Sequence, residues 1–319
     1  MVFRPISMNI FDQHLDSKNQ FLFKDSATGI RLTVKREDQL DAAVSGNKFR
    51  KLKYNIAEAK ANGFKTLLTY GGAFSNHIAA TAKAGKITGL KTVGIIRGDE
   101  LGADLQKTFS QNATLRLADA CGMQLKFISR GQYREKGTPC FRESVLTDFE
   151  DFYELPEGGT NALAIKGCKE ILNAEDKDYD YICCPAGTGG TAAGIIEASE
   201  KHQQILVFSA LKGDFLKEEI ARFTTKQNWS LITDYHCGGY ARVSSDLITF
   251  INESKKTYKI QLDPIYTGKM FYGIHEMIRS GYFSKNTRIL AVHTGGLQGI
   301  PGINARLKKQ GSKLIDYEN

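Results

Sequence analysis

The sequence lacks any run of about 20 apolar residues, so it predicts no helix long enough to span a membrane. Its N-terminus also lacks the apolar core of a secretory signal, and we therefore expect a cytoplasmic protein. Internal repeats, low-complexity segments and long Gly/Ser or Pro linkers are absent from the 319 residues. Any second domain should therefore be packed or inserted rather than tethered.

Cysteines are few, and no pair of them has the spacing of zinc ligands. The six are Cys121, Cys140, Cys168, Cys183, Cys184 and Cys237. We interpret them as reduced, mostly buried thiols and predict no metal site. The net charge is +8, yet no long Lys/Arg block is present. Net charge alone is weak support for nucleic-acid binding, and it fits an anionic ligand equally well.

Short β-branched runs alternate with helical patterns, which predicts an α/β fold with parallel sheets. The predicted strands are 66–70, 91–97, 124–129, 181–185, 205–210, 261–266 and 288–293. The predicted helices are 49–62, 77–88, 104–121, 161–172, 191–201, 215–224 and 268–280. The irregular stretch 130–140 is either a lid or a surface excursion.

A glycine-rich loop follows the predicted strand 181–185 and precedes a helix. Its residues are Gly187, Thr188, Gly189, Gly190 and Thr191. Backbone N–H groups and hydroxyls at a helix N-terminus bind anions, so we favour a phosphate-binding loop. A dinucleotide site fits less well, because the end of the next predicted strand carries no acidic residue before Asp214 and a Walker lysine is missing. A plain strand–helix turn stays open.

Lys48 lies in the segment SGNKFRKL at 45–52, where a turn-forming Ser-Gly-Asn leads into a helical pattern. These residues place Lys48 at the start of the helix. Cationic neighbours and a helix N-terminus lower the pKa of an amine, which favours the free amine that attacks carbonyl groups. The alternative is an ordinary solvated basic face, since Arg50, Lys51 and Lys53 follow.

Three further segments place polar side chains at or just after the carboxyl ends of predicted strands. They are GGAFSNH at 71–77, DPIYTGK at 263–269 and AVHTGG at 291–296. Open α/β sheets bind ligands at the carboxyl ends of their strands. Ser75 and Asn76 either face such a ligand or only cap the next helix, and we expect His77 to pack inside that helix.

In this order, the segments resemble fold type II pyridoxal phosphate enzymes, and most of all the 1-aminocyclopropane-1-carboxylate deaminase and D-cysteine desulfhydrase group. The resemblance runs from about residue 34 to residue 299. It implies two open, mostly parallel sheets flanked by helices, as in the tryptophan synthase β-subunit. It also implies a large cofactor-binding domain of residues 1–50 and 160–319, and a smaller inserted α/β domain of residues 51–159.

The resemblance assigns the cofactor contacts. Pyridoxal 5′-phosphate would lie between the two domains, joined to Lys48, with its phosphate on residues 187–191. Asn76 would bind the ring oxygen O3′, and Thr294 would stand beside the pyridine nitrogen.

The resemblance also assigns the substrate contacts. Ser75 would lie near the substrate carboxylate, Tyr266 near the substrate, and Tyr240 would be a second active-site tyrosine. Either tyrosine could instead be a core residue. The deaminase branch carries glutamate where this chain has Thr267, which is the desulfhydrase-like residue.

The implied function is β-elimination and deamination of a small amino acid, with D-cysteine giving pyruvate, ammonia and sulfide. Lys48 would remove the α-proton of the substrate. One alternative is aminocyclopropane-carboxylate deaminase, and another is a non-catalytic pyridoxal phosphate-binding or regulatory protein. Members of the group are commonly dimers, so we expect a homodimer without nucleic-acid or membrane partners.

Overall fold

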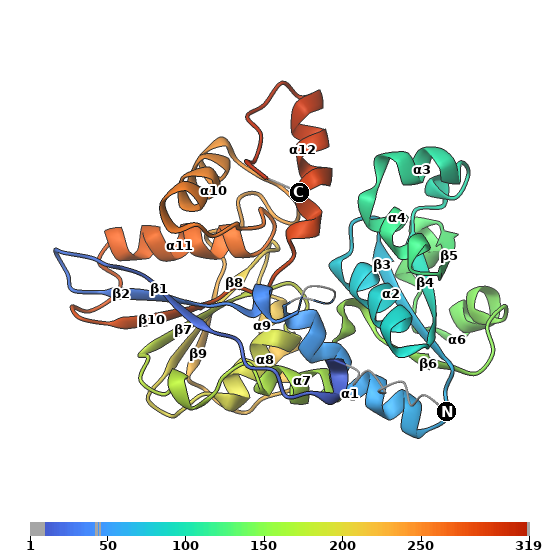
Figure 1. Ribbon diagram of the computed structural model, residues 1–319, viewed down its shortest axis with the longest axis horizontal. Helices are drawn as coiled ribbons and strands as arrows, with labels where there is room; N and C mark the ends of the chain where they lie inside the picture. Colours follow the sequence, from blue (N-terminus) through green and yellow to red (C-terminus); the bar gives the residue numbers. More distant parts are fainter. Residues whose placement is uncertain (1–9, 42–43, 45, 318–319) are drawn as a thin grey trace, which may run out of the picture.

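The strands of the protein form two separate sheets in the computed structural model, which describes residues 10–41, 44 and 46–317 (Figure 1). The six-stranded sheet has the order β1-β2-β10-β7-β8-β9 and the four-stranded sheet the order β5-β4-β3-β6. All strand pairs are parallel except β1–β2. This arrangement confirms the predicted fold class.

The six-stranded sheet consists of β1 (Asn19–Lys24), β2 (Arg31–Lys35), β7 (Tyr181–Ala186), β8 (Gln204–Ser209), β9 (Trp229–Ile232) and β10 (Arg288–Val292). The four-stranded sheet consists of β3 (Thr66–Gly72), β4 (Lys91–Arg97), β5 (Met123–Ile128) and β6 (Phe152–Glu154). The remaining short elements are the 3-10 turns Ile10–Asp12, Glu37–Gln39, Asp99–Leu101, Glu157–Gly159, Ala174–Asp176 and Leu297–Gly299, and the π-helical turn Arg142–Leu146.

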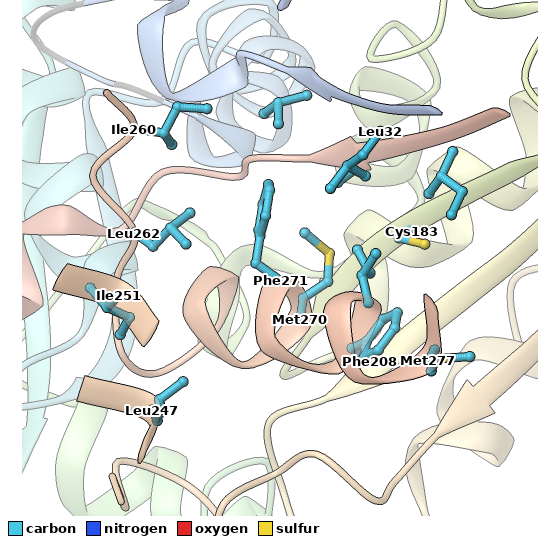
Figure 2. Close-up of a cluster of buried hydrophobic side chains, with 14 of the residues drawn as sticks. Leu32, Cys183, Phe208, Leu247, Ile251, Ile260, Leu262, Met270, Phe271 and Met277 are labelled. Carbon is cyan, nitrogen blue, oxygen red and sulfur yellow. The ribbon is translucent and has the colours of Figure 1, made fainter. Parts of the chain in front are cut away.

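Helices cover both faces of the six-stranded sheet, because successive residues of a strand point to opposite faces. Along β7, Ile182 and Cys184 pack on one face with α7 (Ala162–Lys169), α8 (Gly190–Ala198) and α9 (Leu216–Ala221). Cys183 packs on the other face, shown in Figure 2, with α10 (Ser245–Tyr258), α11 (Thr267–Arg279) and α12 (Ile300–Lys309). The buried faces leave the carboxyl ends of the strands as the place for a site.

The four-stranded sheet is covered on one face by α2 (Asn76–Thr88) and α4 (Ala113–Ala120), with α3 (Leu105–Gln111) just before α4. The other face carries α5 (Arg130–Arg134), α6 (Pro139–Phe141) and the π-helical turn. Tyr133 and Phe141 are buried there against Leu68 and Tyr70. The stretch 130–140, predicted as irregular, therefore contributes to the core of this sheet.

Helix α1 (Asn47–Ala61) runs between the two sheets (Figure 1). The first half of α1 packs tightly on α7. Only glycine fits at position 167 of α7, since a Cβ there would lie 1.9 Å from the backbone oxygen of Arg50. Phe49, Leu52 and Ile56 pack among residues of β3 and α2. The predicted domain boundary at residues 50 and 51 falls inside this continuous helix, and the division into two domains stays a prediction.

Two predicted elements are wrong, and each has a local cause. Residues 261–266 form no strand, because the carboxylate of Asp263 accepts the backbone N–H groups of Ile265, Tyr266 and Thr267. The predicted helix 104–121 is two helices, because Asn112 has extended backbone angles and its side chain accepts the N–H of Leu115.

Two further expectations, reduced thiols and the absence of a membrane-spanning helix, can be compared with the structure. All six cysteines are free; Cys168, Cys183 and Cys184 are buried, whereas Cys140 is exposed. Within residues 10–41, 44 and 46–317, no helix is both long and apolar enough to cross a membrane.

Candidate active site

One pocket brings the predicted segments together, at the carboxyl ends of β3, β7 and β10. The predicted site residues that line it are Lys48, Ser75, Asn76, Gly187, Thr188, Gly189, Thr191, Tyr240, Tyr266 and Thr294. Gly190 does not line the pocket; a Cβ there would lie 2.7 Å from the side chain of Thr160, so close packing requires this glycine. Lining residues that were not predicted include Asn47, Lys51, Phe74, His77 and Gln298.

The start of α1 is fixed by backbone contacts, which places Lys48 in the pocket wall. The N–H of Gly46 donates to the carbonyl of Glu37 at 2.9 Å, and the N–H of Asn47 donates to the carbonyl of Thr294 at 3.3 Å. Gly46 has φ 69°, and a Cβ there would lie 2.0 Å from the Thr294 oxygen. The predicted side-chain cap is not present at Gly46, and Ser45 lies outside the described residues.

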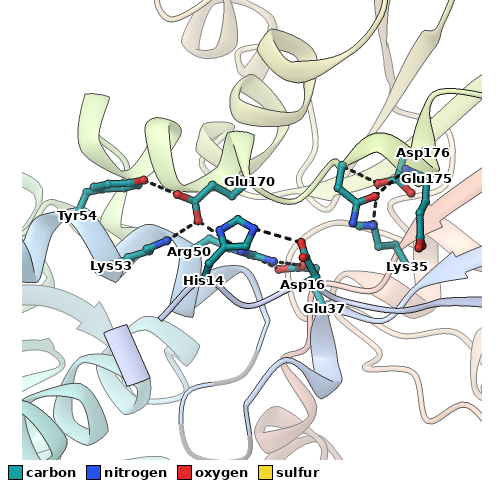
Figure 3. Close-up of polar contacts among 11 residues, drawn as sticks. His14, Asp16, Lys35, Glu37, Arg50, Lys53, Tyr54, Glu170, Glu175 and Asp176 are labelled. Carbon is teal, nitrogen blue, oxygen red and sulfur yellow. Dashed lines mark hydrogen bonds and ion pairs between the residues drawn. The ribbon is translucent and has the colours of Figure 1, made fainter. Parts of the chain in front are cut away.

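Buried ion pairs hold the same helix in place (Figure 3). The guanidinium of Arg50 donates to both oxygens of Glu37, at 3.0 and 3.1 Å, and both side chains are fully buried. Burial is the largest single influence and lowers the pKa of Arg50, but the hydrogen bonds to Glu37 and the negative charges of Glu37 and Glu170 together raise it overall. Lys53 and Tyr54, one turn later, both donate to Glu170. These pairs tie α1 to the segment after β2 and to α7.

The amine of Lys48 is poised for covalent chemistry. Burial, reinforced by the positive charge of Lys51, lowers its pKa from 10.5 to about 7. Near neutral pH a large share of the amine is therefore uncharged, and only the uncharged amine is a nucleophile. The expectation that neighbouring cations depress this pKa agrees with the structure, although burial is the larger cause.

Lys51 is a site residue that the sequence pattern did not single out. Its ammonium donates to the carbonyl of Gly158 and the hydroxyl of Thr160, both at 2.9 Å, and lies 3.4 Å from the hydroxyl of Thr188. Burial lowers its pKa to about 8. The partners lie 107 to 137 residues away along the chain, so no local motif could reveal this contact.

The glycine loop lines the pocket at the start of α8 and has the features of an anion site. Gly189 has φ 77° and occupies the N-cap position, so the first N–H groups of the helix are free to face the pocket. The hydroxyls of Thr188 and Thr160 lie 2.7 Å apart, and the side-chain amide of Asn47 donates to Thr191 at 2.8 Å. Together with Lys51, these groups surround one end of the pocket with hydrogen-bond donors.

Ser75 and Asn76 behave differently from each other. The hydroxyl of Ser75 accepts the backbone N–H of Ile78 at 3.3 Å, so Ser75 is the N-cap of α2. The side-chain oxygen of Asn76 is buried and has no hydrogen-bond partner among the described residues. Capping therefore accounts for Ser75 but leaves Asn76 available to a ligand.

The two predicted tyrosines meet on the open side of the pocket. The ring centroids of Tyr240 and Tyr266 are 6.2 Å apart, and the rings meet edge to face at 64°. Burial, with Tyr240 nearby, raises the pKa of Tyr266 well above its ordinary value, so its hydroxyl stays protonated. Lys269 donates to the carbonyl of Gly239 at 2.8 Å and so holds the loop that carries Tyr240.

Thr267 faces away from the pocket. Its hydroxyl donates to Asp263 at 2.6 Å, and its side chain is fully buried. Among the residues that the structure describes, no Asp or Glu lines the pocket. The pocket is therefore rich in donors and hydroxyl groups and carries no fixed negative charge.

A family model described as "Pyridoxal-phosphate dependent enzyme" matches residues 20–295 of the chain. The chain belongs to this family. It is 31% identical over 297 residues to the bifunctional D-cysteine desulfhydrase/1-aminocyclopropane-1-carboxylate deaminase of Arabidopsis thaliana, covering 85% of this chain and 74% of that protein. It is 27% identical over 296 residues to a D-cysteine desulfhydrase of Klebsiella pneumoniae, covering 84% and 87%.

A solved structure of an ACC deaminase homologue has the same fold, with a TM-score of 0.76 and 23% identity over 95% of this chain and 99% of that one. Membership in the pyridoxal-phosphate family makes the chain an enzyme, so the non-catalytic alternative is not favoured.

The residues present in the pocket fit pyridoxal 5′-phosphate. A nucleophilic amine, a donor-rich anion site at a helix N-terminus, and an unpaired buried Asn76 oxygen lie in one cavity. These three features can bind, in the same order, the aldehyde, the phosphate and the ring hydroxyl of that molecule. The cofactor prediction from the sequence is confirmed by the family.

Proposed function

We propose that this enzyme catalyses β-elimination and deamination of a small amino acid, with D-cysteine converted to pyruvate, ammonia and sulfide. The single observation that carries the reaction type is Lys48, whose amine has a pKa of about 7 and shares its pocket with the anion site. The cofactor, when bound, supplies an electron sink for the carbanion that forms at the α-carbon.

In this proposal Lys48 holds the cofactor, is released when the amino group of the substrate takes its place, and then removes the α-proton of the substrate. Residues 187–191, without Gly190, hold the phosphate together with Lys51. Asn76 binds the ring oxygen, and Thr294 stands beside the pyridine nitrogen. These positions are supported by their shared lining of one pocket.

Substrate contacts follow from the open side of the pocket. Ser75 lies near the substrate carboxylate, and the Tyr240–Tyr266 pair lies near the β-carbon. Because the pKa of Tyr266 is raised, its hydroxyl can donate a hydrogen bond to the departing sulfur. The C–S bond breaks, sulfur leaves with the electron pair and takes up a proton, and water converts the remaining three-carbon enamine to pyruvate and ammonia.

The absence of a lining carboxylate, within the described residues, favours desulfhydration over opening of a cyclopropane ring. A nearby carboxylate would stabilise a protonated pyridine nitrogen and strengthen the electron sink. Ring opening expels carbon and depends more on such help, whereas a thiolate leaves readily. A desulfhydrase of Klebsiella pneumoniae is among the relatives, but so are proteins named as deaminases.

Side-by-side kinetics test the proposal. Purified enzyme is given D-cysteine, L-cysteine, β-chloroalanine and 1-aminocyclopropane-1-carboxylate, with sulfide and 2-oxo acid measured separately. We expect sulfide and pyruvate in equal amounts from D-cysteine, and a lower kcat/KM for the cyclopropane substrate. A higher kcat/KM for the cyclopropane substrate would reverse the choice between the two activities. The homodimer and the cytoplasmic location belong to the same proposal, and sizing of the purified enzyme tests the first.

A further inference from the structure

His77 lies next to Asn76 at the start of α2, and the proposed reaction gives it no role. Its side chain lines the pocket and is only 2% exposed. Neither ring nitrogen has a hydrogen-bond partner among the described residues. Buried polar groups are nearly always paired, so the missing partner points to a group of a bound ligand.

The imidazole packs against the turn at Gly158 and Gly159. A Cβ on Gly159 would lie 2.6 Å from Cε1 of His77, and 3.1 and 3.3 Å from its two nitrogens. Both glycines have positive φ, of 69° and 68°, which lets the turn approach the ring without side chains. The ring edge is therefore held at a fixed place in the pocket wall.

The same turn belongs to the anion site. The carbonyl of Gly158 accepts the ammonium of Lys51 at 2.9 Å. A Cβ on Gly158 would lie 2.8 Å from the side chain of Thr188. His77, Lys51 and Thr188 therefore all contact the turn at Gly158 and Gly159. Lys51 and Thr188 lie at the donor-rich end of the pocket.

Asn76 serves the other end of the pocket. Its side-chain nitrogen lies 2.8 Å from the position of a Cβ on Gly296, in the loop that follows Thr294. Successive residues on a helix point about 100° apart, so Asn76 and His77 can address two parts of one ligand. Asn76 faces the proposed pyridine side and His77 the proposed phosphate side.

The charge around His77 suits a neutral donor. Burial, followed by the positive charges of Lys48 and Lys51, lowers the pKa of His77 well below its ordinary value. A neutral imidazole keeps one N–H donor. A third cation would be repelled by the two lysines, whereas a neutral N–H adds a contact to an anion without that repulsion.

We propose that His77 donates a hydrogen bond to a phosphate oxygen of the bound cofactor and thereby selects the phosphorylated form. The proposal rests on the proposed placement of the phosphate at residues 187–191. It makes His77 a cofactor-binding residue and assigns it no part in moving the substrate proton.

The test compares two ligands in the cofactor-free enzyme: pyridoxal 5′-phosphate and pyridoxal, which lacks the phosphate. His77→Leu removes the donor at similar volume, and His77→Gln keeps an N–H donor. Dissociation constants are measured by absorbance titration in phosphate-free buffer. We expect His77→Leu to weaken pyridoxal 5′-phosphate by about tenfold to a hundredfold, as for a hydrogen bond to a charged group, and to leave pyridoxal unchanged. His77→Gln should recover most of the loss.

A ratio of two affinities within one variant removes any general loosening of the fold, which would weaken both ligands alike. Equal weakening of both ligands in His77→Leu, or no weakening of either, would overturn the proposal. A wild-type enzyme that bound both ligands equally would instead refute the phosphate placement itself. The two failures are therefore distinguishable.

Discussion

Replacing Lys48 with methionine should stabilise the cofactor-free enzyme while removing its activity. The pocket holds Lys48 where its charge is unfavourable, since burial and Lys51 lower its pKa from 10.5 to about 7. Methionine keeps an unbranched chain of similar length and removes the charge. A functional residue that costs stability is expected at an active site.

The size of the effect depends on pH, and its sign follows from proton binding. Between pH 7 and pH 10.5 the unfolded chain holds a proton on Lys48 that the folded enzyme has lost, so folding becomes more favourable as pH rises. Each pH unit between the two pKa values corresponds to about 1.4 kcal/mol. The penalty from Lys48 is therefore about 5 kcal/mol at pH 6, about 2 kcal/mol at pH 9, and absent above about pH 10.5.

Urea unfolding of the cofactor-free proteins at pH 6, 7.5 and 9 measures the difference. We expect the free energy of unfolding of Lys48→Met to exceed that of the wild type most at pH 6, and the difference to be smaller at pH 9. Lys60→Met is the matched control, because Lys60 is exposed on the same helix; it should change stability by less than about 0.5 kcal/mol at every pH. A Lys48→Met gain that does not vary with pH, or a loss of stability at pH 6, would refute this account of the pocket.

Three further outcomes follow from the contacts around the pocket. Arg50→Met leaves the carboxylate of Glu37 buried without its partner, so the free energy of unfolding should fall by about 3–5 kcal/mol in urea, and Glu37→Gln in the same chain should restore part of it. Thr188→Val should weaken pyridoxal 5′-phosphate by about fivefold in equilibrium dialysis, through loss of one hydrogen bond; unchanged affinity would place the phosphate elsewhere. Lys269→Met frees the carbonyl of Gly239 and the tyrosine loop, so kcat/KM should fall about tenfold with unchanged cofactor affinity, as for loss of a hydrogen bond to a charged group.

Much of the fold could be predicted from local patterns. The bounds of β4, predicted as 91–97, agree with the structure, since a run rich in β-branched residues and followed by Gly98 is typical of a strand. The strands β1, β2, β6 and β9 were not predicted. β1, β6 and β9 are half-exposed edge strands with little apolar alternation, whereas β2 is a buried inner strand of only five residues.

The wrong strand at 261–266 shows where local pattern fails. The segment is apolar and mostly buried, as a central strand would be. Pro264 has no N–H to donate, and the next three N–H groups go to the carboxylate of Asp263. Backbone N–H groups that donate to a side chain cannot also form the hydrogen bonds of a β-sheet. The burial of Asp263, which directs them to its carboxylate, is visible only in the folded structure.

The candidate site likewise contains residues that local motifs reveal and residues that they do not. Lys48, Asn76 and the glycine loop stand in local motifs and meet in one pocket, as expected. Lys51 and His77 do not stand out in the sequence, because a basic run on a helix is usually solvated and a histidine within a helix usually packs. Their importance comes from the turn at Gly158, which is about 100 residues away from Lys51 along the chain.

Reductive trapping of the cofactor tests the central claim most directly. The enzyme purified with pyridoxal 5′-phosphate is reduced with borohydride, digested, and mapped by mass spectrometry. The pyridoxyl label should lie on Lys48, and Lys48→Ala should carry no label while it keeps its secondary structure. A label on Lys51, Lys269 or any other lysine, with Lys48 unmodified, would contradict the assignment of Lys48 as the cofactor lysine.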